Sequence, residues 1–332
     1  MRERGPARVM QLDADQTDSS RRGFVPSGAT LAVLVHRLAV LLGAGVSPVA
    51  AWRHAATDDL APMGAAIASA GPNGIPAAIA EQARDLRGGD RSTRRRASPA
   101  VVRGLEGLAA TWDVATASGS PLAGALRSYA TAMRGFASAD RQSTVALSGP
   151  RATARLVIAM PAIGVLFGAA LGHDTLGVLL GSPLGWACLA IGLVLLVCGW
   201  LWNRSLLRRA TAGDRVPGLL PELVAVAMSG GASIDRARAI VEDAVDRYGL
   251  ESDWRTVDGS LAIATGAGAP VGELLRSEAE EARRSAIAEA GERAERLGVS
   301  LMVPLGVCVL PAFIALGVVP LIVSIVGSAV AW

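Results

Sequence analysis

Three long apolar runs constrain what this chain can fold into. They cover residues 156–172, 183–202 and 297–332, and none of them contains Asp, Glu, Arg or His. A helix needs about 20 predominantly apolar residues to cross a bilayer, so the first two runs just reach that length and the third exceeds it. We therefore expect an integral membrane protein with three transmembrane helices.

Arginines flank these runs on one side only, and the sequence contains no lysine. The flanking residues are Arg151, Arg155, Arg204, Arg208, Arg209, Arg293 and Arg296. Positive charges next to membrane spans favour the cytoplasmic side. We therefore expect a multi-pass protein of the inner or plasma membrane, with the N-terminus and residues 203–296 in the cytoplasm and the C-terminus outside.

Four prolines interrupt the apolar runs: Pro161 in the first, and Pro304, Pro311 and Pro320 in the third. Proline removes a backbone hydrogen bond and favours a kink, a defect that neighbouring helices absorb in a membrane. The third run is predicted either as one kinked crossing or as a broken pair of helices, and the single crossing is preferred.

The polar stretches are predicted to be helices joined by glycine turns, in an order that occurs twice. Residues 31–56 and 221–244 both indicate a helix, a glycine turn that ends it, and a second helix that begins at a serine cap. Residues 118–130 (SGSPLAGALRSYA) and 267–279 (AGAPVGELLRSEA) share a second turn followed by a helix. The predicted turn residues are Gly43, Gly45, Pro48, Gly119, Pro121, Gly230, Gly231, Gly268 and Pro270.

The helices after the second turn differ in their surfaces. The first copy carries the apolar stripe Leu122, Leu126, Tyr129, Met133 and Phe136, which has helical spacing. The second copy carries Glu–Arg pairs four residues apart, which are typical of a solvated face. Those pairs are Glu280–Arg284, Glu289–Arg293 and Glu292–Arg296.

These features predict an all-α membrane protein in which one unit is used twice: a cytoplasmic helical bundle followed by an exit into the bilayer. The expected layout is a polar disordered tail (1–28), a first helical domain (29–153) with an Arg-rich loop (84–99), two transmembrane helices (154–203), a second helical domain (204–296) and a third, kinked transmembrane segment (297–332).

The chain resembles the type II secretion system F-domain family, the inner-membrane platform proteins of type II secretion, type IV pili and Tad/Flp pili. The resemblance covers roughly residues 30 to 328 and rests on LLGAGVSP, MSGGAS, GSPLAGAL and GAPVGELL in this order. The ending PLGVCVLPAFIALGVVPLI is most similar to the Tad branch, and residues 58–99 depart from the family pattern.

The resemblance implies several partners: a hexameric cytoplasmic secretion ATPase, a paralogous platform protein, pilin subunits and membrane lipids. It also implies an oligomer. In such a machine ATP is hydrolysed by the ATPase, and the platform protein transmits its motion to the membrane spans.

No catalytic, cofactor or metal site is predicted. The glycines at 266–272 lack a phosphate-loop spacing, and there is no lysine to grip a phosphate. Three histidines (His36, His54, His173) and three cysteines are too scattered for zinc. We therefore expect a protein that is not an enzyme.

Arg94, Arg95 and Arg96 form the densest basic cluster. The alternatives are a solvated loop, a contact with anionic lipid headgroups, or a contact with an acidic patch on a partner. Nucleic acid is not expected, because no aromatic platform or recognition helix accompanies the arginines. A transporter or channel, and a membrane-bound enzyme, stay open as alternative functions.

Overall fold

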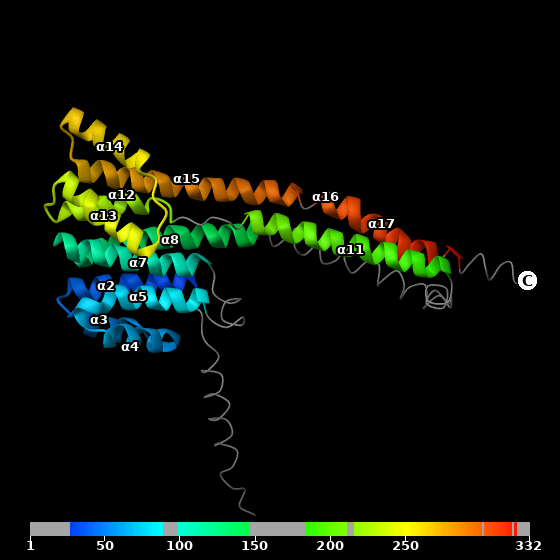
Figure 1. The fold of residues 1–332 in the computed structure, drawn as a ribbon, viewed down its shortest axis with the longest axis horizontal. Coiled ribbons are helices and arrows are strands. Elements are labelled where there is room, and N and C mark those ends of the chain that lie inside the picture. The colour runs from blue at the N-terminus through cyan, green and yellow to red at the C-terminus, as the bar shows by residue number, and fades with distance from the viewer. Residues whose placement is uncertain are drawn as a thin grey trace, which may run out of the picture. The chain divides into compact units, whose positions relative to one another are not determined.

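The structure is a computed structural model, and it describes residues 27–88, 99–146, 183–210, 216–300, 302–320 and 322–323. The described residues form helices and contain no strand (Figure 1), which confirms the predicted all-α class. The chain divides into two compact units. Unit 1 comprises Met1–Ser138 and Asp214–Ile287, and unit 2 comprises Ala139–Gly213 and Ala288–Trp332.

Unit 1 contains the helices of both polar stretches. Its first half holds α2 (Gly28–Gly43), α3 (Pro48–Ala55), the 3₁₀ helix η1 (Asp58–Leu60), α4 (Ala61–Ser69), α5 (Gly71–Gly88), α7 (Pro99–Ser118) and the start of α8 (Leu122–Ala146). Its second half holds α12 (Leu219–Ser229), α13 (Ile234–Tyr248), α14 (Trp254–Ala267) and most of α15 (Val271–Ser300).

The two polar stretches were expected to form a first and a second helical domain. In the structure most of both stretches belongs to the same compact unit. The expected loop at 84–99 also differs from the structure at its edges. Residues 84–88 complete α5, and Pro99 begins α7. Residues 89–98, with Arg94, Arg95 and Arg96, lie outside the described part of the chain.

The first turn has the same backbone geometry in both halves. Gly45 and Gly231 each have φ +84°, a left-handed conformation that glycine adopts without steric cost. The amide of Gly45 donates to the Leu42 carbonyl oxygen at 3.1 Å, and that of Gly231 donates to Met228 at 2.9 Å. The next helix then begins after Ser47 in one half and Ser233 in the other.

The second turn also matches. Gly119 has φ +72° and Gly268 has φ +66°. The amide that follows each glycine reaches back to the preceding helix, from Ser120 to the Ala115 carbonyl and from Ala269 to the Ala264 carbonyl, at 2.9 Å in both cases. Pro121 and Pro270 come next and accept the first hydrogen bonds of α8 and α15.

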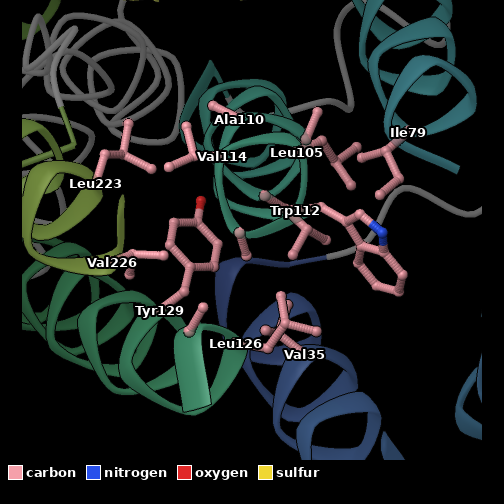
Figure 2. Packing of buried hydrophobic residues seen from close by; sticks show 14 of the residues in the cluster. Val35, Ile79, Leu105, Ala110, Trp112, Val114, Leu126, Tyr129, Leu223 and Val226 are labelled. Carbon is pink, nitrogen blue, oxygen red and sulfur yellow. The ribbon is translucent and has the colours of Figure 1, made fainter. Parts of the chain in front are cut away.

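The core of unit 1 centres on α7. Most of this helix is buried, and it contacts α2, α5, α12 and α13. Trp112 of α7 packs against Trp52 of α3 with ring centroids 6.2 Å apart. Figure 2 presents Tyr129 of α8 in this core, where its hydroxyl donates to the Gly104 carbonyl oxygen at 2.6 Å. Leu126, Tyr129 and Met133 are fully buried, which confirms three of the five members of the apolar stripe predicted for this helix. Leu122 is half-buried, and the side chain of Phe136 lies outside the described part of the chain.

Unit 2 contains α11 (Pro183–Ala210) and a second apolar stretch made of α16 (Met302–Pro304), η2 (Leu305–Val309), α17 (Leu310–Phe313) and η3 (Ile314–Val318). The elements η2 and η3 are π-helical turns. The first predicted run, with Pro161, lies outside the described residues.

The π-helical turns explain how this stretch tolerates proline. A proline in a helix clashes with the carbonyl group four residues before it. That residue is Val307 for Pro311 and Leu316 for Pro320, and both lie inside a π-helical turn. The wider turn moves the carbonyl away from the ring, so the helix continues past Pro311 instead of ending.

Candidate functional site

The two halves of unit 1 meet where α7 packs along α12. A Cβ atom added at Gly107 would lie 3.2 Å from Leu219 Cδ2, and one at Gly230 would lie 2.2 Å from the Ser118 carbonyl oxygen. The Ser120 hydroxyl donates to the Val226 carbonyl oxygen at 2.5 Å. Gly107 meets the first residue of α12, and Ser118, the last residue of α7, meets Gly230 just after the end of α12, so α7 and α12 run parallel.

Side chains fill the middle of this junction. Val114 of α7 lies beside Leu223 of α12 in Figure 2, and Val226 lies beside Tyr129. Val114, Leu223 and Val226 are all buried. The sequence that was predicted to form the second domain therefore shares one hydrophobic core with the first.

A polar cluster closes one side of the junction. The Asp113 carboxylate of α7 accepts from Arg247 at 2.8 Å and from the Tyr248 hydroxyl at 3.0 Å. Arg247 also pairs with Asp243 on its own helix. The charge of Asp113 raises the pKa of Arg247 above its usual value, and burial together with Asp113 raises the pKa of Tyr248.

Each half carries one arginine contact between its first and its last helix. In the second half Arg283 of α15 donates to Glu222 of α12 at 2.5 Å, and the carboxylate is buried. In the first half Arg134 of α8 lies 3.1 Å from the His36 Nδ1 atom of α2. His36 and Glu222 precede Gly45 and Gly231 by the same number of residues, and Arg134 and Arg283 follow Gly119 and Gly268 by the same number.

A further buried carboxylate, Glu106, lies between α5 and α7. Its Oε1 atom accepts from Arg87 at 2.6 Å, while its Oε2 atom has no hydrogen-bond partner among the described residues. Burial raises the pKa of Glu106, and the charges of Arg87 and Arg103 oppose that shift. Burial also raises the pKa of Tyr129, with a smaller contribution from Glu106.

Sequence reasoning did not single out Glu106 or Glu222. The available signal was a lone carboxylate inside an apolar helical run, VVRGLEGLAA for Glu106 and PELVAVAM for Glu222. Such a residue is seldom fully buried unless it is paired. The partners Arg87 and Arg283 come from distant helices, so the pairing itself could not be read from the sequence.

In unit 2, glycines of α11 receive side chains of the second apolar stretch. A Cβ atom at Gly192 would lie 2.4 Å from Leu316 Cγ, and one at Gly199 would lie 3.1 Å from Cys308 Cβ. Because the earlier glycine meets the later residue, the two segments are antiparallel. Gly185, Gly192 and Gly199 are buried and have the spacing of a heptad repeat, a pattern that the sequence analysis did not single out.

Large apolar side chains cover the outside of this helix pair. More than ten are exposed among the described residues; on α11 they are Trp186, Ile191, Leu193, Val194, Val197, Trp200, Leu201 and Trp202. The stretch Gly185–Leu206 is long and apolar enough to cross a membrane by length and composition, and it alone among the described helices meets this criterion. At its C-terminal end the Arg204 guanidinium lies 5.1 Å from the centre of the Trp200 ring.

Within the described residues, no group of three or more His, Cys, Asp or Glu side chains could hold a metal ion. A pocket of about 170 Å³ in unit 1 is lined by residues that include Arg103, Gly218 and Glu278. Ligand pockets usually measure roughly 300–1,000 Å³, so this one offers little room for a metabolite.

The predicted turn residues fall into three groups. Gly45, Gly119, Gly231 and Gly268 adopt the left-handed conformation, while Gly43 ends α2 and Gly230 permits the close approach to Ser118. Pro48, Pro121 and Pro270 lie at or just before helix starts.

Comparison of the chain with protein-family models, with curated proteins and with solved structures finds no match.

Proposed function

We propose that this chain is a non-enzymatic platform protein of the inner membrane. It serves a type II secretion machine or a Tad-type or type IV-like pilus machine, and it couples a cytoplasmic ATPase to the extraction and assembly of pilin subunits. One observation carries this proposal. A single chain combines a polar helical unit, made of two halves with matching turns and matching arginine contacts, with an apolar helix pair whose outer side chains are exposed.

The helix pair is the part that we assign to the membrane. Soluble monomers rarely expose a contiguous apolar surface of more than a few hundred Å², and α11 exposes large apolar side chains along most of its length. Glycines at the contact with the second apolar stretch favour close packing of helices in lipid. Three crossings, with the C-terminus outside, remain the arrangement that we propose.

The matching halves support an internal duplication with both copies in the cytoplasm. The turn glycines, the hydrogen bonds across each turn and the pairs His36–Arg134 and Glu222–Arg283 stand at equivalent positions. The core that the two halves share supports placing both of them in one aqueous compartment. This placement agrees with the arginine bias around the apolar runs.

The proposed mechanism needs no active site on this chain. The helices α8 and α15 each precede an apolar run in the sequence, so a displacement that the ATPase imposes on unit 1 would pass along the chain to the spans. Exposed Glu–Arg pairs on α15 and the arginines at 94–96 are the candidate contacts for the ATPase or for anionic lipid.

The test is genetic and biochemical. We expect a strain that lacks this chain to lose piliation or secretion, and a tagged full-length chain in mild detergent to retain the ATPase encoded beside it. Normal piliation and secretion in the deletion strain, together with no co-purifying ATPase, would rule the platform role out.

The second candidate function is a transporter or channel of unknown substrate. It requires a polar path through the spans, and Asn203, whose side-chain oxygen is buried without a hydrogen-bond partner among the described residues, is the observation in its favour. Solute flux through vesicles that contain the purified chain, lost on Asn203→Leu, would favour it over the platform role.

A further inference from the structure

The junction between the two halves has a counterpart whose faces are both left open. The left-handed glycines align the two halves, with Gly45 equivalent to Gly231 and Gly119 equivalent to Gly268. Each residue of the junction therefore has an equivalent residue in the other half, at the same distance in sequence from the matching glycine. The α12 residues Leu219, Leu223 and Val226 correspond to Val33, Arg37 and Val40 of α2. The α7 residues Gly107, Ala110 and Val114 correspond to Thr256, Gly259 and Ile263 of α14.

The faces that form the junction are covered, and their equivalents are not. Val114, Leu223 and Val226 are at most 3% exposed. In contrast, Val33 is 50% exposed, Val40 is 51% exposed and Ile263 is 64% exposed. A Cβ atom added at Gly259 or Gly266 of α14 would meet nothing within 4 Å. Among the described residues, therefore, one face of each kind has no partner.

We propose that α14 of one copy of this chain packs on α2 of a second copy and forms a head-to-tail interface. Two helices with the same turn geometry already pack in this way inside unit 1, so the intermolecular contact continues an existing interface. The contact is heterologous, since each copy contributes a different face, and it builds a ring or a filament rather than a two-fold dimer.

Local chemistry fits this contact at its centre. Because Gly107 meets Leu219 and Ser118 meets Gly230, Val114 lies at the level of Val226 along the two parallel helices. Ile263 and Val40 are the equivalents of these two residues, so they lie at the same level of the proposed interface. Arg37 replaces the apolar Leu223 and donates to Thr57 of its own chain at 2.7 Å. The open surface at Gly259 leaves room for its aliphatic stem.

Two substitutions prevent the contact from being an identical copy of the junction. Ala44 stands where Gly230 allows the close approach to Ser118, and Ala269 stands where Ser120 donates to Val226. The Cβ atom of Ala44 keeps the helix ends further apart, and Ala269 cannot supply the hydrogen bond that Ser120 makes in the junction. The interface is therefore centred on Val33, Val40 and Ile263, and it is weaker than the junction, so the copies exchange. This inference rests on unit 1 alone and does not require the proposed platform role.

The experiment cross-links two distinguishable copies of the full-length chain. One copy carries Ile263→Cys and the other carries Val40→Cys, each with a different tag, and both are co-expressed and oxidised in membranes. We expect a mixed adduct that retains both tags and yields a 263–40 disulfide peptide. Adducts only between identical variants, or no adduct above that of the parent chain, would overturn the head-to-tail interface.

A second measurement uses charge instead of cysteine. Ile263→Glu should raise the dissociation constant of the oligomer in detergent by about tenfold or more, because a buried carboxylate without a partner is costly. Thr265→Glu, at an exposed position on another face of α14, is the matched control and should leave that constant unchanged. Equal behaviour of the two variants, or a chain that stays monomeric at every concentration, would contradict the proposal.

Discussion

Arg283 of α15 donates a hydrogen bond of 2.5 Å to the carboxylate of Glu222, which is 3% exposed on α12. The pair joins the first and last helices of the second half across a separation of 61 residues. The Glu222 Oε1 atom and the Arg283 Nε atom have no further hydrogen-bond partner among the described residues. The ion pair is therefore the main polar interaction that compensates for the burial of this carboxylate.

Removing only one member of this pair should be more harmful than removing both. Arg283→Met leaves Glu222 buried and unpaired, and we expect it to lower the free energy of unfolding by about 3 kcal/mol. The double variant Glu222→Leu/Arg283→Met should recover most of that loss, since no charge then stays buried. Chemical denaturation of the full chain in detergent measures both. A double variant no more stable than Arg283→Met would contradict this account.

Transferring the acidic partner to the first half should create a second ion pair. His36→Glu places a carboxylate beside Arg134, at the position equivalent to Glu222. Both residues are exposed, so the expected gain in stability is only about 0.5 kcal/mol. A double-mutant cycle with Arg134→Met measures the coupling, and the gain should disappear in that background. A gain that persists without Arg134 would show that the two contacts are not equivalent.

The stability of unit 1 should fall as pH rises through the range in which Glu106 ionises. Burial raises the pKa of Glu106 in the folded chain above its ordinary value of 4.5. Between the unfolded and folded pKa values the folded state binds more protons, so raising the pH lowers the free energy of unfolding.

Glu106→Gln has no carboxyl group to titrate at this position, so this pH dependence is absent from the variant. Its free energy of unfolding should therefore rise relative to that of the parent chain as pH rises above about 4.5. Unfolding measured at several pH values from 4 to 8 gives the difference. Asp258→Asn, on an exposed carboxylate that pairs with Arg238, is the control for a surface charge. A difference between Glu106→Gln and the parent that is independent of pH would disprove the role of this group.

Close packing in unit 2 should be sensitive to a single methyl group. Gly192→Ala places a Cβ atom 2.4 Å from Leu316 Cγ, and we expect it to destabilise the helix pair by about 1–3 kcal/mol. Adding Leu316→Ala should relieve the overlap. Gly306→Ala, where a Cβ atom meets nothing within 4 Å, is the matched control. In thermal unfolding in detergent, the melting temperature of the Gly306→Ala control should be closer to that of the parent chain than the melting temperature of Gly192→Ala.

Local features of this chain follow from its sequence because backbone sterics and short spacings decide them. Only glycine adopts a positive φ without cost, so turns at Gly45, Gly119, Gly231 and Gly268 were predictable. Pairs four residues apart on a helix face each other, and the three predicted Glu–Arg pairs of α15 are present in the structure. The all-helical class follows from the same periodicities.

The tertiary structure decided what those helices pack against. No local spacing indicates that Arg134 meets His36, 98 residues away, or that α7 joins the two halves into one core. Such contacts depend on which apolar faces can be buried together once the chain closes its long loops, and many pairings satisfy the same periodicity. The sequence therefore determined where helices begin, turn and expose charge, whereas packing alone determined which faces are covered and which, like those of α2 and α14, stay open.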